Sequence, residues 1–257
     1  MGNITQVVKQ LIIINVIFFI GSELVPAAKP LFSMFYFENP NFQVWQPLSS
    51  MFMHGGIMNG GIMHIFFNMF ALFSFGSTLE HIWGGKKFLI FYILCGLGAA
   101  ALHLGVSYYE FHKAFDTLVL NGFTPDSIYA GLNQGYGYGD QRWLEFVSQE
   151  NLADMIDAYH KPAVGASGAI YGLLVAFALM FPNAGLSLMF IPVPIKAKFF
   201  VPGLLLLDLY LGVTGGGAIF GGSTGVAHFA HIGGALMGVL LMYYFKKTQF
   251  NKNRWDR

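Results

Sequence analysis

Hydrophobic residues along this 257-residue chain gather in six long runs, separated by segments that carry most of the polar residues. A helix needs about 20 mostly apolar residues to cross the hydrocarbon core of a bilayer. The pattern therefore predicts an all-α bundle of six membrane-spanning helices. The expected spans cover residues 10–28, 62–80, 87–108, 163–181, 199–219 and 226–245. The fifth is the least regular, because Pro202, Asp208 and residues 215–217, all glycine, interrupt it.

Composition supports a lipid environment. Hydrophobic residues make up 55% of the chain and charged residues only 11%, whereas soluble domains carry about 25% charged residues. The net charge of +1 gives no basic stripe for nucleic acid. The single cysteine, Cys95, excludes an internal disulfide and a multi-cysteine metal site. We therefore expect a lipid bilayer as partner, with no nucleic acid, no metal and no cofactor.

The charge distribution predicts the orientation. Basic residues concentrate in cytoplasmic segments of membrane proteins. With six spans and a cytoplasmic N-terminus, ten of the fourteen basic residues fall on the cytoplasmic side: Lys9, Lys86, Lys87, Lys196, Lys198, Lys246, Lys247, Lys252, Arg254 and Arg257. We expect both termini inside, and one domain over residues 1–257 that ends in a short basic tail, 246–257.

Two of the expected outer segments are long. Residues 29–61 are rich in aromatic residues, which favour the membrane–water interface, so an interfacial segment is expected there. Residues 110–161 form an extended polar loop, with an amphipathic helix expected from Arg142 to Ala158. Glycines at 135, 137 and 139 indicate an irregular stretch, and Pro192 and Pro194 predict a non-helical inner connection.

Polar residues inside the spans are costly in lipid and mark candidate sites. They are His64, Asn68, Ser167, Asp208, His228 and His231. The second, fourth and sixth spans all start at the outer face in this topology. His64, Ser167 and His231 then lie within about one turn of each other in depth, because a helix rises about 1.5 Å per residue. They are expected to share a layer just below the outer surface.

Helical spacing places polar residues on one face of the second and fourth spans. Ser167 and Tyr171 are four residues apart, as are His64 and Asn68. A serine needs a base within hydrogen-bond reach to act as a nucleophile, so two helices must approach closely. Small residues four apart allow that approach. They are Gly168 and Gly172 on the fourth span, and Gly234 and Gly238 on the sixth.

Three motifs together resemble those of the rhomboid intramembrane serine proteases. Residues 165–168, Gly-Ala-Ser-Gly, resemble the GxSG motif of that family. Residues 230–238, Ala-His-Ile-Gly-Gly-Ala-Leu-Met-Gly, are similar to its AHxGGxxxG motif. His64 and Asn68 match its HxxxN motif, and Gly76 to Gly84 resemble the G…LE…WG stretch that follows. The motifs come in family order on spans two, four and six.

The resemblance implies roles for specific residues. Ser167 is the expected nucleophile, and His231 the general base that later protonates the leaving amine. The two would form a dyad without a third member. Tyr171 would stack on the His231 ring and orient it.

The resemblance also implies an oxyanion hole, formed by the Ser167 backbone N–H, His64 and Asn68. Gly165 would keep the approach to that hole open. Preorganised donors of this kind are worth roughly 10²- to 10³-fold in rate each. The chain departs from the family pattern at Gln46, where many members carry an arginine after tryptophan. It departs again in the longer 54–64 stretch and in the 110–161 enlargement.

Other interpretations of these residues remain open. Ser167 could serve only as a small residue at a helix contact. His64 and Asn68 could form a structural hydrogen-bonded pair, and Tyr171 could take part in ordinary packing. His228, one turn before His231, is a rival base. Asp208 has no assigned role beyond a polar crevice or a bond to a neighbouring helix.

The leading hypothesis is a serine endopeptidase that cuts single-pass transmembrane substrates near the outer face. Its expected gate is the fifth span and the 215–225 loop. The first alternative is a non-catalytic rhomboid-like protein that binds membrane helices. A transporter is a third hypothesis, but the chain has no internal repeat of the kind transporters often carry. The N-terminus lacks a clear cleavage site and a long targeting extension, which favours a bacterial plasma membrane.

Overall fold

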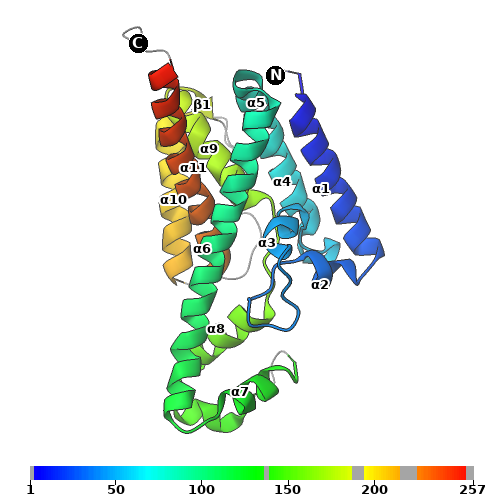
Figure 1. The fold of residues 1–257 in the computed structure, drawn as a ribbon, viewed down its shortest axis with the longest axis vertical. Helices are drawn as coiled ribbons and strands as arrows, with labels where there is room; N and C mark the ends of the chain where they lie inside the picture. The colour runs from blue at the N-terminus through cyan, green and yellow to red at the C-terminus, as the bar shows by residue number, and fades with distance from the viewer. Residues whose placement is uncertain (1–2, 136–138, 187–193, 215–224, 253–257) are drawn as a thin grey trace.

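A computed structural model of the chain describes residues 3–135, 139–186, 194–214 and 225–252. Its apolar helices stand side by side in a bundle (Figure 1). They are α1 (Gln6–Leu24), α4 (Gly61–Ala71) with a π-helical turn (Leu72–Gly76) and α5 (Ser77–Trp83), α6 (Gly85–Leu120), α9 (Ser167–Met180), α10 (Ala197–Thr214) and α11 (Gly225–Lys252). The all-α membrane fold predicted from the sequence is confirmed.

The span predicted over 163–181 corresponds to the shortest of the six apolar helices, α9. Within the described ranges, five helices are long and apolar enough to cross a membrane. The remaining one, α9, has 14 residues. At 1.5 Å per residue it reaches only about 21 Å, short of the roughly 30 Å hydrocarbon core. Its residues from Gly168 to Ala176 are all buried, so α9 is the central helix of the bundle.

Glycines let α9 approach its neighbours closely, as their spacing predicts. A Cβ atom on Gly234 of α11 would lie only 1.8 Å from the carbonyl oxygen of Gly168 on α9. A Cβ on Gly172 would lie 2.3 Å from Cys95 Sγ on α6. These distances leave no room for a side chain. The backbones of α9 and α11 therefore meet directly, which sets the distance between Ser167 and the sixth span.

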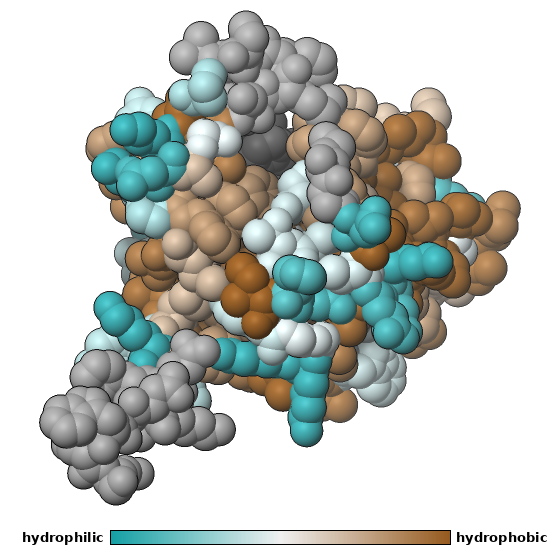
Figure 2. Space-filling view, turned by 90° about the horizontal axis from the view of Figure 1, so that it is seen from above, coloured by the Kyte–Doolittle hydropathy of each residue, from teal (hydrophilic) through white to brown (hydrophobic). Residues whose placement is uncertain are grey.

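The described ends of α1 and α11 lie at one end of the bundle (Figure 1). Viewed from that end, hydrophilic side chains gather on the exposed surface and hydrophobic ones form much of the flanks (Figure 2). Glu80 on α5 fixes α1 here. Its carboxylate accepts hydrogen bonds from Val7 N (3.0 Å), Val8 N (2.8 Å) and Thr5 Oγ1 (2.5 Å). Glu80 thus satisfies backbone N–H groups in the first turn of α1. That this end faces the cytoplasm stays a prediction.

A second cluster of buried side chains forms a lobe at the opposite end (Figure 1). The lobe comprises the last turns of α6, α7 (Pro125–Leu132), a 3-10 turn (Gln141–Glu145) and α8 (Gln149–His160). α6 ends 12 residues beyond the predicted limit of 108, at Leu120, where Gly122 takes a φ of +94°. Phe111, Trp143 and Met155 are buried in the lobe.

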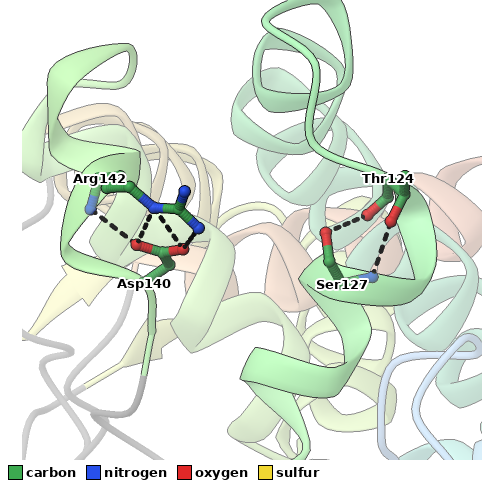
Figure 3. A network of polar contacts seen from close by, with 4 residues as sticks. All are labelled: Thr124, Ser127, Asp140 and Arg142. Atoms are coloured by element: carbon green, nitrogen blue, oxygen red, sulfur yellow. Dashed lines mark hydrogen bonds and ion pairs between the residues drawn. The ribbon is translucent and has the colours of Figure 1, made fainter.

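The helix expected from Arg142 to Ala158 is wrong in its first half. Asp140 caps the 3-10 turn by accepting from the Arg142 N–H (3.0 Å), and it also pairs with the Arg142 guanidinium (Figure 3). The true helix begins at Gln149, because the Ser148 side chain accepts from Asn151 N (3.2 Å). Figure 3 also shows the cap of α7, where Thr124 Oγ1 accepts from Ser127 N (3.2 Å). Side-chain caps thus divide the segment into short elements.

The segment between α1 and α4 holds short helices: α2 (Ala28–Phe32), α3 (Gln46–Ser49) and 3-10 turns at Ser50–Phe52 and Ile57–Asn59. The side chain of Gln46 is fully buried and holds this segment together by hydrogen bonds. Its Nε2 donates to the carbonyls of Pro30 (3.1 Å) and Asn41 (2.9 Å), and its Oε1 accepts from Phe35 N (3.2 Å). Gln46 is therefore a structural residue in this chain. The interfacial position of the segment stays a prediction.

A two-residue antiparallel ladder joins α9 to α10, with β1 (Gly185–Leu186) paired to β2 (Ile195–Lys196). The inner connection is non-helical at both described ends, as expected, while Pro192 lies outside the described residues. Of the predicted 135–139 loop, residues 136–138 lie outside them too. Of the expected gate loop, 215–225, residues 215–224 lie outside the described residues as well, and α10 is described as far as Thr214.

Candidate active site

The backbone before α9 presents Ser167 at the first position of the helix. Ala163 pairs with Met34 in a β-bridge, and Gly165 N donates to Ser50 O (2.9 Å). Gly165 has a φ of +129°, a conformation that side chains rarely adopt, and it turns the chain into the helix. The late start of α9 relative to the predicted 163 follows from this turn.

Ser167 and His231 are in hydrogen-bond contact. Their Oγ and Nε2 atoms lie 2.8 Å apart, although the residues are 64 positions apart in the chain. His231 is on α11 and 7% exposed. The approach follows from the glycine contacts between α9 and α11. The structure thus brings together the serine and the histidine that the motifs single out.

Tyr171 lies one turn below Ser167 on α9 and contacts the same histidine. Its ring stacks on the imidazole of His231, with centroids 4.2 Å apart and planes inclined by 7°. The ring of His231 is therefore held between a phenol face and a serine hydroxyl. This contact matches the stacking that the resemblance implies.

His64, Asn68 and Gly165 lie near Ser167. A Cβ atom on Gly165 would lie 3.1 Å from His64 Nε2 and 3.4 Å from Ser167 Oγ, so these two side chains flank the glycine. Asn68 is buried, and its Nδ2 donates to the carbonyl of His64 (2.8 Å). One N–H of that amide is thus used within α4. The arrangement places an imidazole and an amide near the serine, where an oxyanion hole would be needed.

Asp208 is the site residue whose partners sequence reasoning missed. It is 1% exposed on α10, and its Oδ1 lies 2.5 Å from His228 Nδ1. Its Oδ2 lies 3.3 Å from His231 Nδ1. One signal pointed to this cluster: two histidines three residues apart on one helix face, with a carboxylate on the preceding span. His228, the rival base, contacts the carboxylate, while His231 contacts the serine.

Within the described part of the chain, these three residues are also the group of carboxylate and imidazole side chains that lies close enough together to share a metal ion. One ligand atom from each of Asp208, His228 and His231 lies within 4.8 Å of the others. One carboxylate and two imidazoles are a donor set that zinc accepts. However, His231 already contacts Ser167 through Nε2. The expectation of no metal stays a prediction.

His54 lies behind His64, with ring centroids 5.1 Å apart. It is 2% exposed and also packs edge-on against Phe19. Burial, and secondarily the neighbouring His64, lower the pKa of His54 to about 3. Its imidazole is therefore neutral over the ordinary pH range, and it supports His64 by packing.

A cavity of about 1090 Å³ lies beside the serine. Asn68, Ser167 and Tyr171 line one end, and Thr5 and His81 line the other. Between these ends its walls are mostly apolar side chains of α4, α5, α9 and α10. The cavity therefore extends from the Ser–His contact toward the end of the bundle that holds the N-terminus.

The fold and this site define a class: a multi-pass integral membrane protein with a serine and a histidine paired inside a helical bundle. The chain belongs to the rhomboid family. The family model for the rhomboid domain matches residues 41–124 and 145–248, more than half of the chain. Residues 125–144, between the two matched ranges, contain α7.

Two curated proteins illustrate the relationship. The chain is 26% identical over 185 residues to Rhomboid protein 1, mitochondrial, of Saccharomyces cerevisiae, covering 72% of this chain and 38% of that protein. It is 28% identical over 204 residues to Rhomboid protease AarA of Providencia stuartii, covering 77% of this chain and 54% of that protein. The chain thus matches about half or less of each relative's length. Family membership supports intramembrane proteolysis.

Proposed function

We propose that this chain is an intramembrane serine endopeptidase that hydrolyses peptide bonds of single-pass transmembrane substrates near the outer membrane face. The observation that carries the proposal is the 2.8 Å contact between Ser167 Oγ and His231 Nε2 inside the bundle. A hydroxyl in contact with a neutral imidazole is the arrangement that activates a serine nucleophile.

In the proposed reaction, Ser167 Oγ attacks the scissile carbonyl carbon while its proton passes to His231 Nε2. The resulting imidazolium then donates that proton to the leaving amine nitrogen, and the C–N bond breaks. Water, deprotonated by the same nitrogen, hydrolyses the acyl-enzyme and restores the serine. The cycle needs no metal or cofactor.

The developing oxyanion needs donors in a low-dielectric site. Ser167 is the first residue of α9, and the first N–H groups of a helix have no partner within it. The positive end of the helix dipole favours a negative charge at the same place. We assign the Ser167 N–H, His64 and Asn68 to the oxyanion hole, with Gly165 leaving the approach open.

The cavity beside Ser167 is the proposed path for the substrate. Its apolar walls suit a segment of a transmembrane helix, and it lies between the second span and α10. A helix hides its carbonyls in hydrogen bonds, so the segment must unwind near the serine. Substrates with glycine or proline at that depth are therefore expected to be preferred. Lateral access between α10 and the second span remains the proposed gate.

The alternative is a non-catalytic rhomboid-like protein that binds membrane helices. The chain retains both Ser167 and His231, in contact, which favours catalysis. A protein that only binds helices has no need of this contact. For the cellular location, we propose a bacterial plasma membrane, and fractionation of cells expressing the native gene tests it.

Cleavage of a single-pass reporter with a glycine pair in its outer half tests the proposal. Wild type, Ser167→Ala, His231→Ala and His228→Ala are compared in proteoliposomes, and labelling of Ser167 by a fluorophosphonate is measured in parallel. We expect both Ser167→Ala and His231→Ala to lose cleavage, by up to about 10⁶-fold, and His228→Ala to retain part of it.

Ser22→Ala is the matched control, because Ser22 is also a buried serine but donates to Phe19 O within its own helix, α1. It should cleave at the wild-type rate. Cleavage or labelling that survives Ser167→Ala contradicts the proposal. Binding of the reporter without cleavage by wild type favours the alternative.

A further inference from the structure

Asp208 is a carboxylate in the middle of an apolar helix, and its side chain is 2% exposed. Burying an ionised carboxylate costs several kcal/mol unless it is paired. Ionisable residues within membrane helices are rare for this reason, and they usually mark function. The proton transfers proposed above involve two side chains, Ser167 and His231, and leave Asp208 without a role.

The contacts of Asp208 lead directly to the general base. The distances run from Ser167 Oγ to His231 Nε2 (2.8 Å), and from His231 Nδ1 to Asp208 Oδ2 (3.3 Å). The serine and the carboxylate thus lie on opposite nitrogens of one imidazole. In serine hydrolases with a triad, the carboxylate occupies that same position.

His231 Nδ1 and Asp208 Oδ2 have no hydrogen-bond partner of good geometry among the described residues. Both atoms are buried, and an unmet polar group in such a place is costly. A small movement of the imidazole toward the carboxylate would satisfy both. The other carboxylate oxygen is already held by His228 Nδ1 at 2.5 Å.

Resting on the proposed protease function, we infer that Asp208 is a positioning residue for His231, itself anchored by His228. Its carboxylate holds the imidazole in the tautomer with the proton on Nδ1. Nε2 is then free to accept the proton of Ser167. The carboxylate also stabilises the imidazolium formed in that step and itself stays deprotonated.

The charge balance around His231 supports this assignment. The groups facing its ring are Asp208 from α10, Tyr171 from α9, His64 from α4 and, on its own helix, His228. Among these four, Asp208 alone carries a negative charge at neutral pH. It is therefore the group able to offset the positive charge that His231 acquires during catalysis.

Asp208→Asn tests the inference, because it removes the charge with little change in volume. We expect kcat to fall roughly 10²- to 10⁴-fold while KM changes little. The acidic limb of the profile of kcat/KM against pH should move to lower pH, since the imidazolium has lost its counter-charge. Asp208→Glu, which retains the carboxylate, should restore the limb toward its wild-type position.

Leu209→Ala is the control on the same helix, because this neighbouring side chain is 42% exposed whereas Asp208 is buried. Its kcat and pH profile should equal those of wild type. A folded Asp208→Asn chain with the wild-type rate and profile overturns the inference while leaving the protease function intact. Failure of wild type to cleave or to label Ser167 instead overturns the proposed function itself.

A measurement on the unaltered sequence covers the case in which Asp208→Asn does not fold. Histidine labelled with ¹⁵N reports which imidazole nitrogen carries the proton, and His231→Ala assigns the signal. Above the pH at which His231 is charged, we expect the proton on Nδ1. A neutral His231 with its proton on Nε2 overturns the inference.

Discussion

The phenol ring of Tyr171 lies flat against the imidazole of His231, with centroids 4.2 Å and planes 7° apart. Stacking of this kind leaves the ring edge free and fixes its plane. The nitrogen that faces Ser167 is thereby held in one direction. The contact depends on Gly172, the next residue, since any Cβ there would push α9 away from α6 and α11.

Tyr171→Phe should therefore keep proteolysis within a few-fold of wild type, whereas Tyr171→Ala should lower kcat by about 10²-fold. A misplacement of reacting groups by about 1 Å has an effect of that size. Initial rates of reporter cleavage in proteoliposomes measure the difference. Equal losses in the two variants would show that the hydroxyl, rather than the ring face, is what matters.

Gly165→Ala is expected to impair both folding and activity. Alanine is strained at a φ of +129°, and its Cβ would lie 3.1 Å from His64 Nε2. We expect the free energy of unfolding to fall by about 1–3 kcal/mol and cleavage to fall by roughly 10²-fold. Unfolding in detergent and reporter cleavage are the measurements.

Gly105→Ala on α6 serves as the control, since a Cβ there meets nothing within 4 Å. Alanine in a helix interior is better than glycine by roughly 0.5–1 kcal/mol. This variant should therefore be as active as wild type and at least as stable. If Gly165→Ala behaves like Gly105→Ala, the backbone turn before Ser167 has no special role.

The contact between α9 and α11 gives a third prediction. In Gly234→Ala, the new methyl group would lie 1.8 Å from the Gly168 carbonyl oxygen, so the helices must separate. Overpacking of this kind costs typically 1–3 kcal/mol. The thermal unfolding midpoint should fall, and cleavage should fall with it because Ser167 and His231 move apart.

Gly203→Ala on α10 is the control for Gly234→Ala, because a Cβ at Gly203 meets nothing within 4 Å. Its unfolding midpoint should be unchanged or higher. A Gly234→Ala chain with the wild-type midpoint would mean that the backbones do not touch at this position.

The site could be predicted from the sequence as far as depth and helix face allow. Apolar runs place helix ends, and spacings of four place side chains on one face. His64, Ser167 and His231 were matched in this way. The rotation of α10 about its axis is not encoded in such a pattern. Asp208 therefore appeared as an isolated polar residue, although it contacts both histidines of α11.

Hydropathy also misplaces helix ends where helices leave the apolar layer. α6 continues through polar residues to Leu120, because helix formation depends on propensity and capping rather than on apolarity. The signal for its end was present, since Asn121 and Gly122 are typical of a helix C-terminus. The short α9 has a different cause, the backbone turn at Gly165.

His54 gives a prediction on pH. The pKa of this side chain is lowered to about 3 by burial, from about 6.5 in the unfolded chain. Between these two values the unfolded chain binds a proton that the folded chain does not. The protonation of His54 therefore does not reduce the free energy of unfolding above about pH 6.5. Below that pH, the free energy of unfolding falls by up to about 1.4 kcal/mol per pH unit as the pH approaches 3.

His54→Leu removes the titrating group and keeps an apolar contact with Phe19. The unfolding free energy of the variant should decline less steeply than that of wild type between pH 6.5 and 4. The difference between the two slopes isolates His54, because His160, whose pKa burial also lowers, is present in both chains. Denaturant titrations in mild detergent at several pH values measure both slopes, and parallel curves would mean that His54 is protonated equally in the folded and unfolded chains.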